Sequence, residues 1–255
     1  MIHVMDYPLL VFMLSFFALW LSTRMGAFFR RRWRNPEPDT RGDFDVVLTA
    51  ALTLLGLIIG FSFSMALGRY DQRKNLEEEE ANAIGTEYVR ADLLPAADAA
   101  KAHGLLRDYL DQRVLLYSTR DKQQILKINA RTAQLQTELW AAVRAPAAAQ
   151  PTPLVALVVG GMNDVLNSQG YSQAAWWNRI PIAAWILMAA IAICCTFMCG
   201  YGARNAKAEG ALFLVLPFLL SVSFFLIADI DSPRGGVIRV HPQNLTSLAE
   251  SLRAQ

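Results

Sequence analysis

A dense cluster of ionisable side chains lies between residues 73 and 80, where two basic residues precede four consecutive glutamates. In a helix, Arg73 would stand one turn before Glu77 and Lys74 one turn before Glu78, and such pairs attract each other on a helix surface. Four consecutive carboxylates cover every side of a helical turn, so most of them must be solvated. Two interpretations follow: a solvated helix next to a membrane, or a ring of charge at a pore mouth if several copies assemble symmetrically.

Two more carboxylates, Asp229 and Asp231, stand where an apolar run near the C-terminal end stops. A carboxylate at the interface depth of a membrane needs a cation or backbone donors. Arg234 and Arg239 are candidate partners. We interpret Asp229, Asp231 and Arg234 as a structural clamp, and a role in transport is the alternative.

Catalytic and metal-binding patterns are missing from the sequence. There is no G-x-S-x-G, H-E-x-x-H or P-loop motif. His3, His103 and His241 are too far apart in sequence to form a helical metal pair. The three cysteines share one apolar run, from Cys194 to Cys199, where thiols behave as small hydrophobic groups. We therefore predict that the protein is not an enzyme and holds no metal and no cofactor.

The apolar residues are gathered into long runs, which indicates a membrane protein. Hydrophobic residues make up 54% of the sequence, against about 45–50% in a soluble domain. A helix needs about 20 apolar residues to cross the hydrocarbon core, and four segments meet this condition: 7–29, 44–67, 180–201 and 211–228. The leader of the first segment carries an aspartate and no cleavage site follows, so we interpret it as a retained span rather than a signal peptide. The net charge of +2 gives no reason to expect nucleic-acid binding.

Residues 68–179 are predicted to form a helical domain outside the membrane. Apolar residues recur there at helical spacing, as in Leu106 and Leu110 or Leu135 and Leu139. The prolines between 145 and 153 predict a linker, and the apolar stretch after them is short enough for a core helix. Residues 229–255 are assigned to an extramembrane C-terminal tail. No segment of the insert alternates like a strand, so the predicted fold class is all-α, a multi-pass membrane protein with four transmembrane helices and a helical insert between helices two and three.

The second span carries small residues at every fourth position: Gly56, Gly60, Ser64 and Gly68. Small residues in one stripe let another helix approach closely, so we predict a helix-packing seam. Ile59 and Phe63 lie one turn apart and about 100° from this stripe. They form either the apolar neck of a pore or a surface that faces lipid or a neighbouring helix.

Basic residues gather in two short loops, 30–43 and 203–209. The positive-inside rule predicts that these loops are cytoplasmic, which puts both termini and the large helical domain outside.

Three motifs resemble the bacterial bestrophin-like domain family: "LLGLIIGFSFSMALGRYDQRKNLEEEEANAIGTEYVRADLLP" at 54–95, "NRIP" at 178–181 and "DIDSPRGGVIRV" at 229–240. The likeness covers nearly the whole chain and implies a multi-pass protein of the bacterial plasma (inner) membrane. More distantly, the chain is similar to bestrophins, which are pentameric anion channels with four membrane helices in each subunit. In those channels the second helix lines the pore, carries bulky apolar residues at a narrow neck and continues into a helix with arginine and aromatic residues. The resemblance implies that the stretch 55–73 plays this part here.

Two functions remain open. The first is a homo-oligomeric ion channel for small anions, in which the second span surrounds the axis, Ile59 and Phe63 form the neck, and Arg69, Arg73 and Glu77 set the charge at the mouth. The second is a non-conducting membrane scaffold or sensor whose helical domain binds a protein partner. The expected partners are the lipid bilayer, further copies of the chain (a pentamer by resemblance) and small anions. A ring of copies in detergent would support the channel, and a monomer would support the scaffold.

Overall fold

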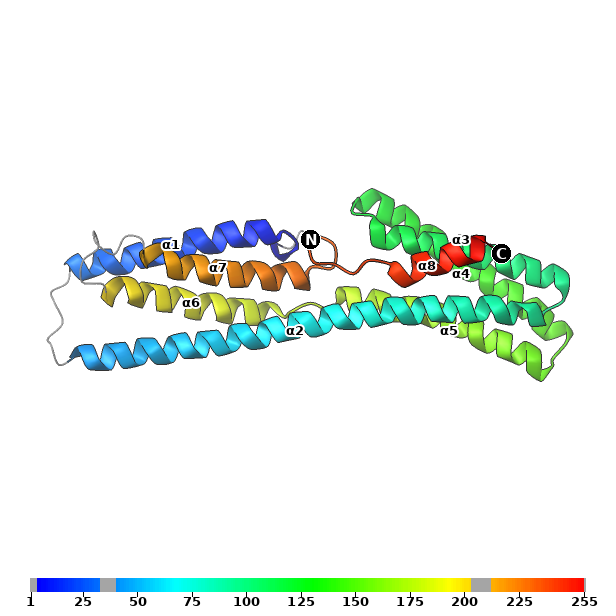
Figure 1. Cartoon of the computed structure of the whole chain (residues 1–255), viewed down its shortest axis with the longest axis horizontal. Coiled ribbons are helices and arrows are strands. Elements are labelled where there is room, and N and C mark those ends of the chain that lie inside the picture. Colours follow the sequence, from blue (N-terminus) through cyan, green and yellow to red (C-terminus); the bar gives the residue numbers. More distant parts are fainter. Residues whose placement is uncertain (1–3, 33–39, 203–211, 255) are drawn as a thin grey trace. The chain divides into compact units, whose positions relative to one another are not determined.

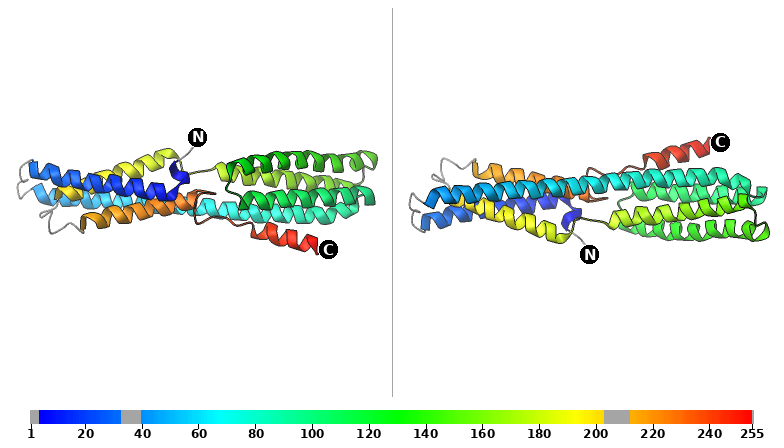
Figure 2. Two further views of the ribbon diagram at one scale, coloured as in Figure 1. Left: turned by 90° about the horizontal axis from the view of Figure 1, so that it is seen from above. Right: turned by 90° about the horizontal axis from the view of Figure 1, so that it is seen from below.

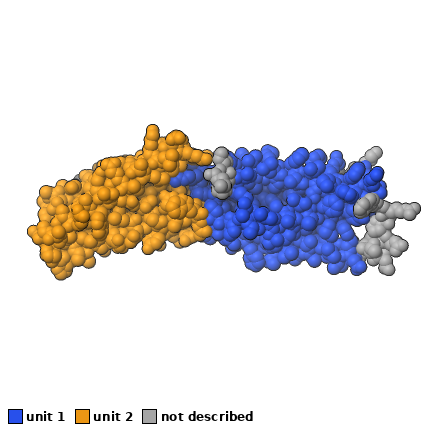
Figure 3. Space-filling view, turned by 180° about the vertical axis from the view of Figure 1, so that it is seen from behind, with its two compact units in different colours: residues 1–69, 179–239 blue, residues 70–178, 240–255 orange. Residues whose placement is uncertain are grey.

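The structure is a computed structural model of the 255-residue chain and describes residues 4–32, 40–202 and 212–254. Residues 33–39 of the basic loop 30–43, and all of the loop 203–209, lie outside these ranges. Every regular element within the described ranges is helical (Figure 1), which confirms the all-α prediction. The chain divides into two compact units, residues 1–69 with 179–239 and residues 70–178 with 240–255 (Figure 3).

Unit 1 contains the four apolar runs that are predicted to cross the membrane. Its elements are η1 (Val4–Asp6), α1 (Pro8–Arg32), the first part of α2 (Thr40–Arg90), α6 (Ile182–Gly202) and α7 (Leu212–Asp231). Among the described residues, four candidate spans meet the length and hydropathy conditions: Pro8–Arg32, Asp43–Leu93, Pro153–Gly202 and Phe213–Asp231. The prediction of four transmembrane helices is therefore confirmed.

Helix α2 is much longer than a membrane span. Its 51 residues extend for about 77 Å at about 1.5 Å per residue, more than twice the roughly 30 Å of a hydrocarbon core. Only its apolar part, residues 44–67, suits the hydrocarbon, and charged side chains recur from Arg69 onward. The helix ends at Arg90 and passes through the short 3-10 helix η2 (Ala91–Leu93). Leu94 is extended, with ψ of 163°, because the ring of Pro95 disfavours a helical residue before it.

Helices α1 and α6 pack closely through two glycines. A Cβ added at Gly26 would overlap the carbonyl oxygen of Phe197, and one added at Gly200 would overlap that of Thr23. Ser22 Oγ supports the crossing by donating a hydrogen bond of 2.8 Å to the carbonyl oxygen of Ile193. Because glycine has no side chain, the two backbones can come into direct contact, as in the small-residue seams of membrane helices.

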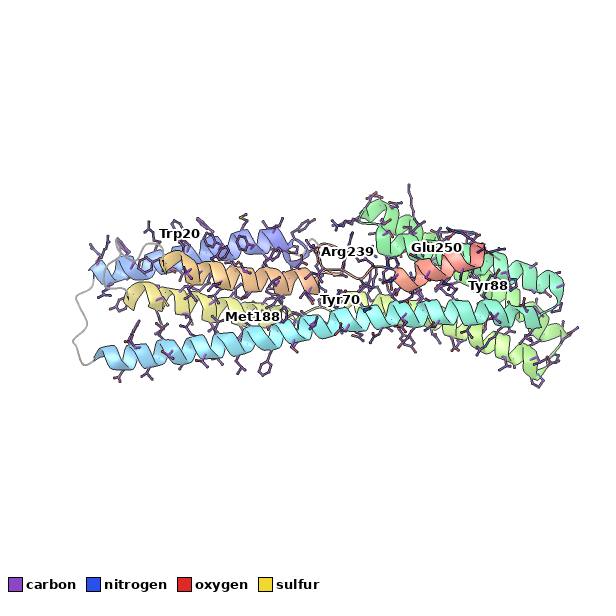
Figure 4. The ribbon with its side chains drawn as sticks, viewed as in Figure 1. Trp20, Tyr70, Tyr88, Met188, Arg239 and Glu250 are labelled. Carbon is purple, nitrogen blue, oxygen red and sulfur yellow. The ribbon has the colours of Figure 1, made fainter. Side chains whose placement is uncertain are left out.

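Unit 2 is a helical bundle with its own hydrophobic core (Figure 2). Its elements are the rest of α2, η2, α3 (Ala96–Ser118), α4 (Lys122–Ala149), α5 (Pro153–Trp177) and α8 (Gln243–Arg253). Fully buried side chains from α2, α3, α4 and α5 meet in this core, among them Ile84, Leu106, Leu135 and Met162. Tyr88 lies on the part of α2 that belongs to this unit, and Glu250 lies on α8 (Figure 4).

Two segments differ from the predictions. Helix α4 continues through Pro146 to Ala149, so the linker is shorter than 145–153. Pro146 is buried in the last turns of the helix, where its ring removes one backbone donor without ending the helix. Residues 240–255 belong to unit 2, because α8 buries Leu245, Ala249 and Leu252, one face of the helix.

Candidate functional site

Only one narrow face of the apolar part of α2 is buried against other parts of its own chain. Leu55, Ser62 and Ala66 are 4% exposed or less, and they follow one stripe of the helix. Phe61, by contrast, is 64% exposed. The remaining faces of this part of α2 are therefore available to lipid or to another chain.

The small-residue stripe lies on the open side of α2. A Cβ added at Gly56, Gly60 or Gly68 would meet no described atom within 4 Å, and Ser64 is exposed. At about 100° per residue, Gly60 lies roughly 160° around the helix from the buried Ser62. A shallow groove along the first turns of α2 continues the open side toward the N-terminal end, and Val46, Thr49 and Thr53 line it. A helix that packs on this stripe is thus not found among the described residues of the same chain.

Ile59 and Phe63 lie between the buried face and the open stripe. Ile59 is half-buried, and Phe63 is 39% exposed. At about 100° per residue, Ile59 lies only about 20° around the helix from the buried Ala66, and Phe63 lies about 20° from Gly56. The exposed part of each side chain is therefore available to lipid or to another chain.

The three charged residues of the predicted pore mouth have different environments. Arg69 belongs to unit 1, and its Nη1 lies 4.0 Å from Asp231 Oδ1 at the end of α7. Arg73 and Glu77 belong to unit 2 and are only 2% and 1% exposed. Glu77 accepts hydrogen bonds from the backbone N–H of Leu245, at 2.9 Å, and from Asn244 Nδ2, at 2.7 Å. A carboxylate at this position satisfies first-turn donors of α8 and complements the helix dipole.

The run of four glutamates divides between the core and the solvent. Glu77 and Glu80, three positions apart, are buried, whereas Glu78 and Glu79 are exposed. Arg113 of α3 holds Glu80 in a two-point ion pair, through Nε and through Nη2 at 3.2 Å. Ser172 Oγ of α5 donates a third hydrogen bond to Glu80, at 3.2 Å. The carboxylate therefore ties α2 to both α3 and α5.

Two tyrosines of α3 share this buried environment. Tyr109 is fully buried and Tyr117 is 7% exposed. Burial, and next the negative charge of Glu80, raises the pKa of each phenol above its ordinary value. Both hydroxyls therefore stay neutral, and the charge of the cluster is carried by Glu80 and Arg113.

The carboxylates after the fourth span close the end of α7. Asp229 accepts hydrogen bonds from the backbone N–H groups of Val237, at 2.8 Å, and Ile238, at 2.7 Å. Asp231 accepts hydrogen bonds from Arg179 Nε, at 2.8 Å, and from the backbone N–H of Ile180. Arg234 lies in the turn that follows α7.

Arg179 joins three segments of unit 1 and was not selected by the sequence analysis. Besides its bond to Asp231, its Nη1 donates to Asp6 Oδ1 at 2.7 Å. The N-terminal segment, the residues before α6 and the end of α7 are therefore held by one guanidinium group. Its place inside the "NRIP" motif was the available signal.

Glu80 and Arg113 were also missed as a pair. Arg113 falls on the apolar stripe of α3 that contains Leu106 and Tyr109, and a charged residue on such a stripe needs a buried partner. That rule identifies Arg113 as paired, but it does not identify Glu80.

The described residues include no group of three His, Cys, Asp or Glu side chains placed to hold a metal ion. The three cysteines are free thiols. The polar contacts of the described residues include ion pairs, helix caps and hydrogen bonds both within and between helices.

Comparisons with known proteins agree on one family. A family model described as "Bestrophin-like domain" matches residues 10–245. A bacterial bestrophin homologue from Klebsiella pneumoniae has a similar structure, with a TM-score of 0.65, 13% sequence identity and coverage of 93% of this chain and 97% of that chain. A variant of that homologue gives a TM-score of 0.67 at 11% identity, with 94% and 97% coverage. Another structure, described only as a membrane protein, gives 0.62 at 14% identity, with 93% and 97% coverage. No curated protein matches the chain.

Proposed function

The chain belongs to the bestrophin-like domain family, and on that premise we propose that it is the subunit of a homo-oligomeric ion channel for small anions. In this proposal α2 surrounds the central axis, and the assembly is a pentamer in the bacterial plasma (inner) membrane. The basic loops 30–43 and 203–209 face the cytoplasm, following the positive-inside rule.

The observation that carries the proposal is the poor cover of α2 by its own chain. In the apolar window of α2 only 11% of the residues are buried, whereas half of the window of α7 is buried. The two windows have the same mean hydropathy, 2.4, so α2 is as apolar as α7 but lacks its neighbours. Further copies of the chain arranged in a ring would supply them.

The small-residue stripe offers the contact between copies. Gly56, Gly60, Ser64 and Gly68 are open in the single chain, and a stripe of this kind lets two helices approach to backbone distance. With this stripe against a neighbouring copy, Ile59 and Phe63 come to the axis as an apolar neck. Apolar constrictions of this type control ion passage by dewetting.

Charge at the end of the span favours anions. Arg69 follows the apolar part of α2 directly, and copies of it around an axis would raise the local anion concentration. Arg73 and Glu77 are buried in unit 2, so in this proposal their side chains do not touch a passing ion. Asp229, Asp231 and Arg234 act in this proposal as the structural clamp at the end of α7.

Recordings from the purified protein in planar bilayers test the proposal. Phe63→Ala should widen the neck and raise the anion current several-fold. Phe61→Ala is the matched control, because Phe61 lies about 160° around the same helix and should leave the current unchanged. A monomer by mass measurement in detergent, or silent bilayers from a folded oligomer, would contradict the channel and favour the non-conducting scaffold.

A further inference from the structure

Glu87 is a buried carboxyl group near the C-terminal end of α2, outside the membrane-spanning part. Its side chain is 0% exposed. Neither carboxyl oxygen has a hydrogen-bond partner in the described part of the chain. This sets it apart from the other buried carboxylates of unit 2, since Glu77 and Glu80 each accept at least two hydrogen bonds.

A glycine of α5 makes room for Glu87. A Cβ added at Gly161 would overlap Glu87 Oε2 and would lie 2.6 Å from Arg90 Nη1. Two side chains of α2 thus fill the space that a side chain on α5 would occupy. The contact between α2 and α5 at this point therefore consists of the Glu87 carboxyl group and the Arg90 side chain packed against a glycine.

The charged groups around Glu87 have opposite effects on its pKa. Arg90 lies on the same helix, and Asp164 lies on α5 one turn after Gly161. On the neighbouring elements η2 and α3, Asp92 and His103 are 3.4 Å apart and pair with each other. Burial raises the pKa of Glu87 to about 8, Arg90 partly counteracts the rise, and Asp164 adds to it.

We propose that the contact between Glu87 and Gly161 is a proton-dependent joint between α2 and α5. With its proton, the carboxyl group is neutral and tolerates burial without a partner. Without the proton, the carboxylate is a buried charge that accepts no hydrogen bond and has only the nearby Arg90 to offset its burial, so contact with water becomes more favourable than burial. Loss of the proton therefore opens the joint.

The direction of the pH dependence follows from the raised pKa. The closed joint keeps a proton that a solvated carboxyl group would release above its ordinary pKa of 4.5. Its stability is therefore complete below about pH 4.5, decreases as the pH rises, and reaches its lower limit above about pH 8. Between these limits the opening equilibrium rises about tenfold for each pH unit.

Thermal unfolding of the full chain in detergent between pH 6 and 9 tests the proposal. The side-chain amide of Glu87→Gln does not titrate in this range. The Tm of the unmodified protein minus the Tm of Glu87→Gln should therefore decrease as the pH rises. Glu79→Gln is the matched control, since Glu79 is an exposed glutamate of the same helix, and its Tm should follow the unmodified protein. Parallel pH curves for the unmodified protein and Glu87→Gln would overturn the proposal.

Infrared spectroscopy of the unmodified protein gives a second readout that does not depend on the variant folding. A carbonyl stretch of a protonated carboxyl group should be present at pH 6 and disappear with a midpoint near pH 8. A spectrum with no protonated carboxyl group at pH 6 would overturn the proposal by itself.

Discussion

Replacing Arg113 by methionine should destabilise unit 2 more than any change to a surface ion pair. Arg113 and Glu80 are 1% and 0% exposed in their side chains, so neither charge has access to water. In Arg113→Met, the Glu80 carboxylate keeps only the hydrogen bond from Ser172, at 3.2 Å. A buried charge is then left without its countercharge.

The expected cost follows from this burial. Breaking a buried ion pair by removing one partner costs about 3–5 kcal/mol, which is roughly two to four orders of magnitude in an equilibrium constant. The double variant Glu80→Met with Arg113→Met removes both charges, and such apolar replacements are often neutral. We therefore expect the double variant to be more stable than either single variant, with a coupling energy of several kcal/mol in a double-mutant cycle.

Pulse proteolysis of the detergent-solubilised chain in increasing urea measures these differences. Arg253→Met is the matched control, because Arg253 pairs with Asp111 at 2.7 Å but the two side chains are 65% and 46% exposed. An exposed pair contributes about 0.2–1 kcal/mol, so this control should lose little. If Arg113→Met cost no more than Arg253→Met, the reasoning from burial would be refuted.

Two further predictions concern the cap of α8 and the seam between α1 and α6. Glu77→Gln should weaken the cap of α8 and speed hydrogen exchange at the amides of 244–252. The control Glu79→Gln should leave this exchange unchanged. Equal exchange rates in the two variants would show that the cap does not need the charge of Glu77. Gly200→Ala would set a Cβ 2.8 Å from a carbonyl carbon of α1, where carbon atoms prefer about 3.5–4.0 Å. The two helices must then separate, which should cost about 1–3 kcal/mol of stability. The Tm of Gly200→Ala should therefore be lower than that of the control Gly160→Ala, whose added Cβ meets open space. Equal Tm values for the two variants would contradict a close seam.

The spans and the helical insert could be predicted because their signals are local. The length of an apolar run decides whether it can cross a membrane, and the recurrence of Leu106, Leu110, Leu135 and Leu139 decides the helical class. Helix α8 could have been predicted from the same kind of signal, since Leu245, Ala249 and Leu252 share one face. Its assignment to a tail overlooked that periodicity.

The polar contacts could not be predicted in the same way, because they depend on which helices meet. Asp231 was expected to form part of a clamp with Arg234, whereas the cation that donates to it in the structure, Arg179, stands 52 positions before it. Arg113 and Glu80 are 33 positions apart. Burial can be inferred from a stripe on one helix, whereas the identity of the partner requires the packing of two.

The contact of Glu77 with α8 has a consequence for the order in which the protein is made. Unit 2 consists of residues 70–178 and 240–255, so its last helix leaves the ribosome only after α6 and α7 have been synthesised. At about 5–20 residues per second, the roughly 75 residues between the end of α5 and the end of α8 take about 4–15 s to add. Throughout this time the nascent bundle exposes the apolar surface that α8 will cover, and Glu77 lacks the hydrogen bonds from Asn244 and Leu245. Translation speed through the last two spans therefore sets how long an incomplete domain is open to chaperones or to misassembly.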